Sequence, residues 1–251
     1  MSIATFCKHV CSAFGALLIT LCANQVQAKD AWYPSKYGAD DTIGALNELS
    51  PSKTKRAAEL VKLGKSYALG VETGPDSPAY SPRTYNVTVL QLDDGMGTPM
   101  GNNKATGNDD LMTFWMGIGS QIDGLGHMGE NHRYYNGNLA RDFVTPTGLT
   151  KLSIDKLPPI ASRGVLLDMA KLMGQAILPE GTAFNSVEIK AAAKTANITI
   201  EAGDVVLFHT GWMNVMESDP KRFMAGEPGL GMDGAESVSY THLRAHETID
   251  D

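Results

Sequence analysis

Two apolar runs on either side of a capped helix constrain the fold of this chain more than any other feature. Residues 163–168 (Arg-Gly-Val-Leu-Leu-Asp) and 204–212 (Asp-Val-Val-Leu-Phe-His-Thr-Gly-Trp) carry consecutive apolar side chains without alternation, which predicts buried strands. Between them, Asn185 and Glu188 have the spacing of a capping box, which predicts a helix ending near Ala196. Strands interleaved with helices indicate an α/β or mixed α+β domain.

The N-terminal half predicts further elements of the same domain. Ser50 and Pro51 are a typical N-cap and first residue of a helix, whose apolar spacing continues to Leu63. Alternating apolar side chains predict strands at 67–71 and 85–89. Glycine, Asn and Asp are frequent in the 95–110 segment, which predicts a long surface loop of the kind that often covers a site. No repeat or long linker divides the chain.

The first 28 residues have the order of a secretory signal. A weakly basic start is followed by an apolar run over residues 10–21, and Val26-Gln27-Ala28 offers a small residue for cleavage before Lys29. The apolar run is shorter than the roughly 20 residues that span a bilayer. We therefore expect a periplasmic or secreted protein that no membrane segment holds after cleavage. All three cysteines (Cys7, Cys11 and Cys22) lie in this segment, so the mature chain would have no thiolate chemistry.

The C-terminal residues resemble a product of DNA technology. Residues 237–248 agree with one translated frame of a transposon-end adapter used in sequencing libraries. We therefore expect residues 29–236 to be an incomplete domain and residues 237–251 to be an artefact tail. On this interpretation His242 and His246 ligate nothing, although their spacing would suit a metal on one helix face. A further alternative is that the truncated chain does not fold stably, because missing strands would expose its core.

Charge narrows the choice of partner. The chain has 21 Lys and Arg against 28 Asp and Glu, a net charge of -7, and no run of basic residues. Nucleic acid is therefore not an expected partner, and a small molecule is.

The densest chemistry lies in the glycine-rich stretch that ends at His127. Gln121 and Asp123 are two positions apart, so on an extended chain their side chains share a face, and a turn at Gly124 and Gly126 could return His127 to the same point. An amide oxygen, a carboxylate and an imidazole at one point could hold a divalent cation, with the imidazole as ligand or as base. The alternative is structural, because an Asp in a glycine-rich turn usually caps its own backbone.

Asp123-Gly-Leu-Gly-His127 resembles the D-x-x-x-H half of the H-x-x-x-H-x-D-x-x-x-H motif of the cyclase family, which includes bacterial kynurenine formamidase and isatin hydrolase. Other blocks of the chain are similar to this family in the same order, and together they cover nearly all of residues 32–236. They are Gly38–Asn47, Tyr135–Gly137, Arg163–Asp168, Gly203–Trp212 and Pro228–Gly231.

The resemblance implies a swivelling β/β/α domain, commonly a homodimer when full length, with zinc or manganese that activates water against an amide or lactam carbonyl. Asp123 matches the metal-binding aspartate and His127 the final histidine, a general acid/base candidate. Gln121 stands at the second histidine position and Gly117 at the first. Gln offers one neutral oxygen and Gly no side chain, so this Gln-bearing branch would favour an oxygen-binding ion such as manganese, or no metal. Further ligands of the family, a His and a Glu, belong to a C-terminal part that this sequence lacks.

The sequence thus predicts a metal-assisted hydrolase of an amide or lactam C–N bond, similar to the arylformamidase that takes tryptophan breakdown to kynurenine. Asp123 and Gln121 would bind the metal, and His127 would transfer protons. Trp115 and His209 would line the substrate pocket, although Trp115 fits a core equally well and His209 a solvent-facing strand end. The alternative is an exported small-molecule-binding protein of the same fold that has lost metal and catalysis.

Overall fold

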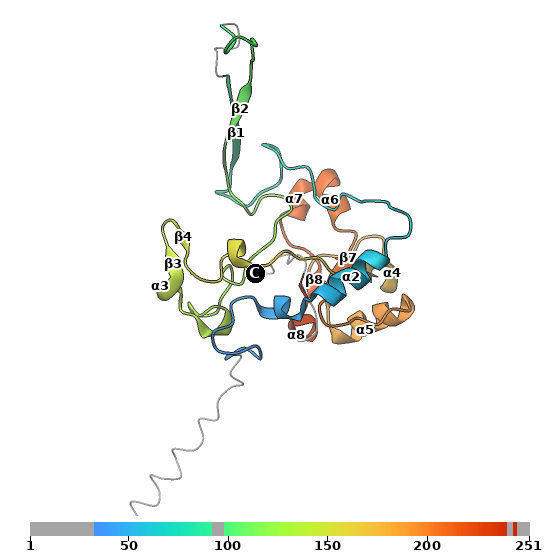
Figure 1. Cartoon of the computed structure of the whole chain (residues 1–251). Coiled ribbons are helices and arrows are strands. Elements are labelled where there is room, and N and C mark those ends of the chain that lie inside the picture. Colours follow the sequence, from blue (N-terminus) through green and yellow to red (C-terminus); the bar gives the residue numbers. More distant parts are fainter. Residues whose placement is uncertain (1–32, 92–97, 240–242, 245–251) are drawn as a thin grey trace, which may run out of the picture.

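The computed structural model describes residues 33–91, 98–239 and 243–244 (Figure 1). The predicted secretory signal, His242 and His246 lie outside these residues. No helix in the described part of the chain combines the length and the apolar character needed to cross a bilayer.

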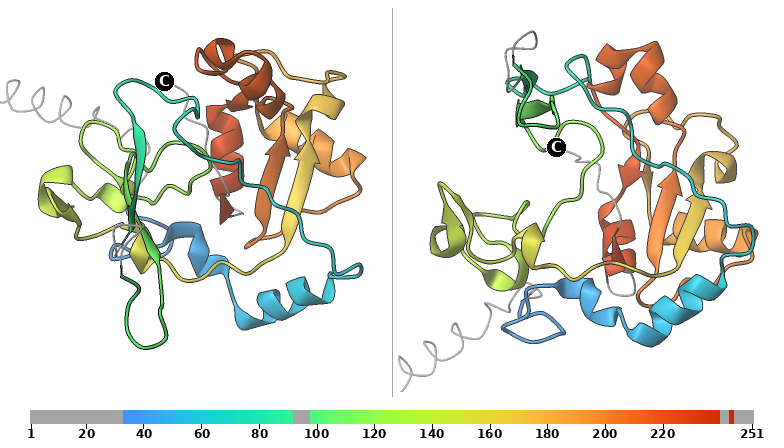
Figure 2. Two further views of the ribbon diagram at one scale, coloured as in Figure 1. Left: turned by 90° about the horizontal axis from the view of Figure 1, so that it is seen from above. Right: turned by 45° about the horizontal axis from the view of Figure 1, so that its top comes forward.

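The body of the molecule is built around a parallel strand pair. β5 (Gly164–Asp168) pairs with β7 (Val205–His209), with Val165 opposite Val206, and β9 (Leu243–Arg244) pairs with the other edge of β7. α4 (Met169–Leu172) and α5 (Ser186–Thr195) contact this pair, and α8 (Met232–Ser239) contacts α5 (Figure 2). The predicted mixed α/β class is confirmed.

The main core forms where these elements meet. The capping box of α5 is present, with Asn185 as N-cap and the Glu188 carboxylate accepting from the Asn185 backbone N–H at 2.8 Å, and the helix ends at its C-cap Ala196 as predicted. This fixed start aims Ile189, Ala192 and Ala193 at the strands. The buried cluster consists of Val165, Leu167, Met169, Ala170, Leu178, Phe184, Ile189, Ala192, Ala193, Val206 and Val238.

The prediction that these strands are buried on both faces is wrong for β5. Its side chains alternate, with Val165 and Leu167 buried while Leu166 is 59% exposed. Helices α4 and α5 shield one face only, so the apolar run in the sequence overstates the burial.

The segment before the first hairpin differs most from prediction. α2 (Pro51–Glu59) begins as predicted, with the Ser50 hydroxyl accepting from the Lys53 backbone N–H, but it ends at Glu59 rather than near Leu63. The predicted strand at 67–71 is wrong. The Val71 N–H donates to the Ser120 hydroxyl at 2.9 Å instead of to a neighbouring strand, and the segment runs as exposed irregular chain.

An antiparallel hairpin projects from the body (Figure 1). β1 (Tyr85–Gln91) pairs with β2 (Asn108–Phe114) with Tyr85 opposite Phe114, which confirms the predicted strand at 85–89. The segment expected to be a loop over a site lies partly outside the described residues. Its remainder turns at the far end of the hairpin, and β2 begins inside it at Asn108.

Short elements complete the chain. They are the 3-10 helices η2 (Gly44–Glu48), η3 (Tyr135–Gly137) and η4 (Ile154–Lys156), the helices α3 (Ala140–Phe143), α6 (Met213–Ser218) and α7 (Pro220–Phe223), and the two-residue strands β3 (Val144–Thr145), β4 (Gly148–Leu149), β6 (Ala183–Phe184) and β8 (Gly229–Leu230). β9 and the end of α8 fall in the segment that resembles adapter sequence, and Val238 there is 2% exposed.

Candidate active site

The glycine-rich loop starts at the base of the hairpin. The Trp115 N–H donates to the Thr84 carbonyl at 3.1 Å, and the Ile118 N–H then closes a turn onto the Trp115 carbonyl. Gly119 has a φ of 75°, and a Cβ there would lie 2.1 Å from the Thr73 hydroxyl oxygen, so only glycine fits this close approach. The loop is therefore held by the irregular segment on one side and by the hairpin on the other.

The second half of the loop packs on the chain near Leu152. The Gly126 N–H donates to the Leu152 carbonyl at 3.2 Å, and a Cβ at Gly126 would lie 2.7 Å from a methyl carbon of Leu149. The His127 N–H donates to the Gly124 carbonyl at 2.9 Å, which forms the turn that the glycine spacing predicts.

This turn brings two of the predicted site residues together. His127 Nε2 lies 4.0 Å from Asp123 Oδ1, and the two side chains are 42% and 22% exposed. At this distance the two atoms can form an ion pair but not a hydrogen bond. A small side-chain rotation would bring them within hydrogen-bond distance. An imidazole near a carboxylate is a residue pair suited to general acid/base catalysis.

The two positions where the sequence departs from the family motif are both engaged within the loop. In the orientation that satisfies its amide, Gln121 donates to the carbonyl oxygens of Gly117 at 3.3 Å and Gly119 at 3.2 Å. Arg83 Nη1 donates to the same Gly117 carbonyl at 2.9 Å. Arg83 precedes β1 and was not singled out from the sequence, because no local pattern links it to a loop 34 residues later.

These contacts bear on the expected divalent metal. In residues 33–91, 98–239 and 243–244, no three His, Cys, Asp or Glu side chains are grouped so that they could hold a metal ion. Asp123 and His127 provide two such groups, Gln121 is turned onto backbone carbonyls, and the space beside Gly117 holds a guanidinium. The described residues therefore do not fit a tightly held zinc ion, which takes three or four protein ligands. The metal stays a prediction.

His209 lies in a second His–Asp pair. The parallel register places it opposite Asp168 at the carboxyl ends of β7 and β5, and His209 Nδ1 lies 3.0 Å from Asp168 Oδ1. Asp168 also caps α4 by accepting from the Lys171 N–H at 2.9 Å. The hydrogen bond with His209, followed by that from Lys171, holds the pKa of Asp168 below its usual value. The sequence did not predict Asp168 as a partner, although strand register could have indicated it.

Trp115 lies at the surface rather than in the core. It is 49% exposed and Met116 is 76% exposed, while Phe114 is half-buried with its ring centroid 5.5 Å from that of Tyr85. Burial in a core is therefore not its role in the described structure. His132 is exposed in a neighbouring turn, with φ 63°.

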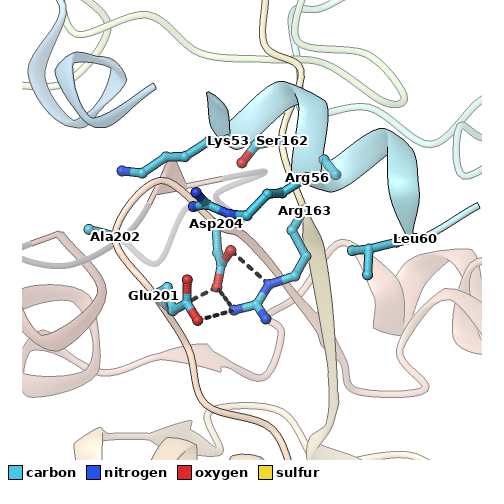
Figure 3. Close-up of a pocket in the computed structure, with 9 residues that line it drawn as sticks. Lys53, Arg56, Leu60, Ser162, Arg163, Glu201, Ala202 and Asp204 are labelled. Carbon is cyan, nitrogen blue, oxygen red and sulfur yellow. Dashed lines mark hydrogen bonds and ion pairs between the residues drawn. The ribbon is translucent and has the colours of Figure 1, made fainter. Parts of the chain in front are cut away.

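A hollow of about 190 Å³ lies away from these residues, between α2 and the amino ends of β5 and β7 (Figure 3). Arg163 crosses it to pair with Asp204, where Arg163 Nε donates to Asp204 Oδ1 at 2.9 Å, and its Nη2 is 4.0 Å from Glu201. Lys53 and Arg56 add positive charge from α2. No predicted site residue lines this hollow, and ligands of open α/β sheets usually bind at the opposite, carboxyl ends of the strands.

Comparison with known proteins identifies the family. The Cyclase family model, described as "Putative cyclase", matches residues 61–247, so the chain belongs to this family. A crystal structure described as that of a novel cyclase superposes with a TM-score of 0.72 at 24% identity, covering 82% of this chain and 71% of that one. This likeness confirms the predicted cyclase-like fold. No curated protein matches the chain.

Proposed function

We propose that this cyclase-family protein hydrolyses the C–N bond of an amide or lactam, with a substrate similar to those of arylformamidases. The observation that carries the proposal is the turn at Gly124 that sets the His127 imidazole 4.0 Å from the Asp123 carboxylate, on a loop fixed at both ends. Family membership makes an enzyme the expected class.

In this mechanism His127 takes a proton from the water that attacks the carbonyl carbon and gives it to the leaving nitrogen. Asp123 stabilises the imidazolium between these two transfers. A divalent ion, if bound, would polarise the carbonyl and acidify water. The Asp123 carboxylate and the neutral His127 imidazole are the groups that could hold it. The described residues do not complete a ligand set, and the two proton transfers use only the side chains of His127 and Asp123.

The test is turnover of N-formylkynurenine and isatin by the full chain and two variants. Proton transfer by a positioned side chain contributes about a hundredfold to ten-thousandfold, so we expect His127→Ala to lower kcat/KM by at least about a hundredfold. Asp123→Asn should lower it by a smaller factor, because the imidazole remains. His132→Ala is the matched control, since His132 is an exposed histidine of the next turn, and its activity should stay within about twofold. Wild-type activity that survives His127→Ala would refute the assignment.

A second candidate is an exported protein of the same fold that binds a small molecule without catalysis. Its support is the loop itself, where the two family histidine positions hold Gln121 and Gly117. Gln121 donates to backbone carbonyls, and the Gly117 carbonyl accepts from Arg83. Elemental analysis of the purified chain, with activity measured before and after added Mn²⁺ or Zn²⁺, separates the candidates. Binding without turnover under every metal condition would favour this second function.

We also propose export to the periplasm or medium and a homodimer for the full-length protein. Export is supported by the order of residues 1–28, and the dimer by the apolar side chains that one face of the projecting hairpin leaves exposed, among them Val89 at 59% and Met112 at 47%. An isolated two-stranded hairpin is marginally stable in water, so a covered face would stabilise it.

A further inference from the structure

Arg83 is a basic residue that contacts the candidate active-site loop. Its Nη1 donates to the Gly117 carbonyl at 2.9 Å, and its Cζ lies 5.6 Å from the centre of the Tyr80 ring. Gln121, two residues before Asp123, donates to the same carbonyl oxygen. Arg83 and Gln121 are therefore neighbours across a single acceptor atom, on the loop that carries Asp123 and His127.

The charge of this guanidinium is not neutralised within the described structure. No carboxylate oxygen in residues 33–91, 98–239 or 243–244 forms an ion pair with Arg83, whereas Arg163 pairs with Asp204 and Glu201, and Arg222 pairs with Glu180. Arg83 is half-buried, so solvent screens its charge incompletely. A guanidinium has five N–H donors, and one of them is used by Gly117, which leaves donors for a ligand.

The absence of a side chain at position 117 is linked to this arginine. A Cβ at Gly117 would lie 2.9 Å from Arg83 Nη1 and 3.2 Å from its Cζ. A side chain at position 117 would therefore crowd the guanidinium, which would have to shift from its present position. The glycine leaves the space that the arginine uses in this contact.

We infer that Arg83 binds an anionic group of the ligand, and that the substrate of this site is an acid, with a carboxylate beside the amide or lactam. A guanidinium matches a carboxylate with two parallel hydrogen bonds, which gives direction as well as affinity. The inference rests on the proposed function for the identity of the bond that is cleaved. The recognition of an anion rests on Arg83 alone.

The probes are benzoate and benzamide, which share ring and shape and differ in charge. Titrations of the full chain by NMR at neutral pH should show benzoate binding at least about tenfold more tightly than benzamide. Arg83→Gln should weaken benzoate about tenfold to a hundredfold and leave benzamide within about twofold, because a charged hydrogen bond is lost. Arg83→Lys should fall between, since the charge remains but the paired geometry does not. Gly117→Ala, which keeps the arginine but shifts its guanidinium from the present position, should also weaken benzoate binding.

Two control variants test whether Arg83 acts only through stability and whether benzoate binds at a different place. Arg133 makes the same kinds of contact elsewhere, donating to the Gly137 carbonyl at 3.1 Å with its Cζ 4.9 Å from the Tyr33 ring centre. Arg133→Gln should leave benzoate affinity unchanged, and an equal loss would show that Arg83 acts through stability alone. Arg56→Gln tests the hollow beside α2. Loss of benzoate binding in Arg56→Gln but not in Arg83→Gln would overturn the inference. Equal binding of benzoate and benzamide by the wild type, or no binding of either, would also overturn it.

Failure of this inference and failure of the proposed function give different results. Preference for benzoate that depends on Arg83, without turnover of any amide or lactam, supports the inference and refutes the hydrolase. Turnover that depends on His127, with a preference for benzoate that Arg83→Gln does not change, refutes the inference and supports the hydrolase.

Discussion

Asp41 shows how single side chains join distant parts of this chain. Its carboxylate accepts from the Gly44 N–H at 2.9 Å, from Asn47 Nδ2 at 2.6 Å and from the Tyr135 hydroxyl at 2.7 Å. Burial alone would raise the pKa of Asp41, but the hydrogen bonds from Tyr135, Asn47 and the backbone outweigh it and hold the pKa below its usual value. The blocks Gly38–Asn47 and Tyr135–Gly137, which each resemble the cyclase family, are thus joined by this contact.

This lowered pKa predicts an acid-dependent loss of stability. A carboxyl whose pKa is lower in the folded state stabilises the protein above its unfolded pKa of about 3.9, and that stability is lost as the pH falls through the folded value. We therefore expect the free energy of unfolding to fall below about pH 4, and Asp41→Asn to reduce that fall while destabilising the protein at pH 7. Urea unfolding at a series of pH values would measure both effects. Asp109→Asn, in the hairpin, is the control and should leave the curve unchanged.

Asn136 makes the companion contact and holds a left-handed backbone, with φ 56°. Its side chain accepts from the Ser35 N–H at 2.7 Å and donates to the Gly38 carbonyl at 2.8 Å. Asn136→Ala should cost about 3 kcal/mol and Asn136→Gly about 2 kcal/mol, because both lose the hydrogen bonds and only Ala strains the left-handed backbone. Equal losses in thermal unfolding would show that the backbone conformation contributes nothing.

Residue-level prediction succeeds where the relevant partners are close in the sequence. The spacing of Gly124 and Gly126 was enough to predict the turn that brings His127 back to Asp123. The approach of Arg83 to Gly117 was not predictable, because the hairpin pairing that brings them together depends on a register of seven residue pairs. Asp168 and His209 are likewise joined by strand register, which the separate apolar runs do not fix.

At the scale of elements, the starts of β5 and β7 are joined by an ion pair between a buried carboxylate and a partly exposed guanidinium. Asp204 is 4% exposed, and it accepts from Arg163 Nε at 2.9 Å and from the Glu201 N–H at 2.7 Å. Arg163→Ala would leave this carboxylate buried without its cation, so we expect a loss of about 3 kcal/mol in the free energy of unfolding. Arg141→Ala, which breaks an exposed pair with Asp142, should cost less than about 0.5 kcal/mol. A similar small loss in both variants would contradict the prediction.

Elements were predictable where capping or continuous apolar runs marked them. The capping box of α5 and the Ser50 cap of α2 gave correct starts, because these signals are local hydrogen bonds. The end of α2 and the supposed strand at 67–71 were not predictable, because Leu60, Val61, Tyr67 and Leu69 have apolar spacing but meet no covering element among the described residues. Burial is a tertiary property, and local spacing reports only the potential for it.

At the scale of the whole molecule, substitutions in the projecting hairpin test the proposed dimer. Val89→Lys combined with Met112→Lys would replace two exposed apolar side chains on one face of the hairpin by charges. If a second copy covers them, light scattering should show a shift from dimer to monomer, and the melting temperature should depend less on protein concentration. Leu63→Lys, at a position 78% exposed on the body, should change neither. A dimer that survives the double variant would place the interface elsewhere.

The His209–Asp168 contact also reports the register in which β5 and β7 pair. Side chains alternate along a strand, so sliding β7 past β5 by one residue would turn the imidazole to the opposite side from its carboxylate. The NMR resonances of this one ring should therefore distinguish the correctly assembled sheet from a shifted one, for any variant or solvent condition that loosens the molecule.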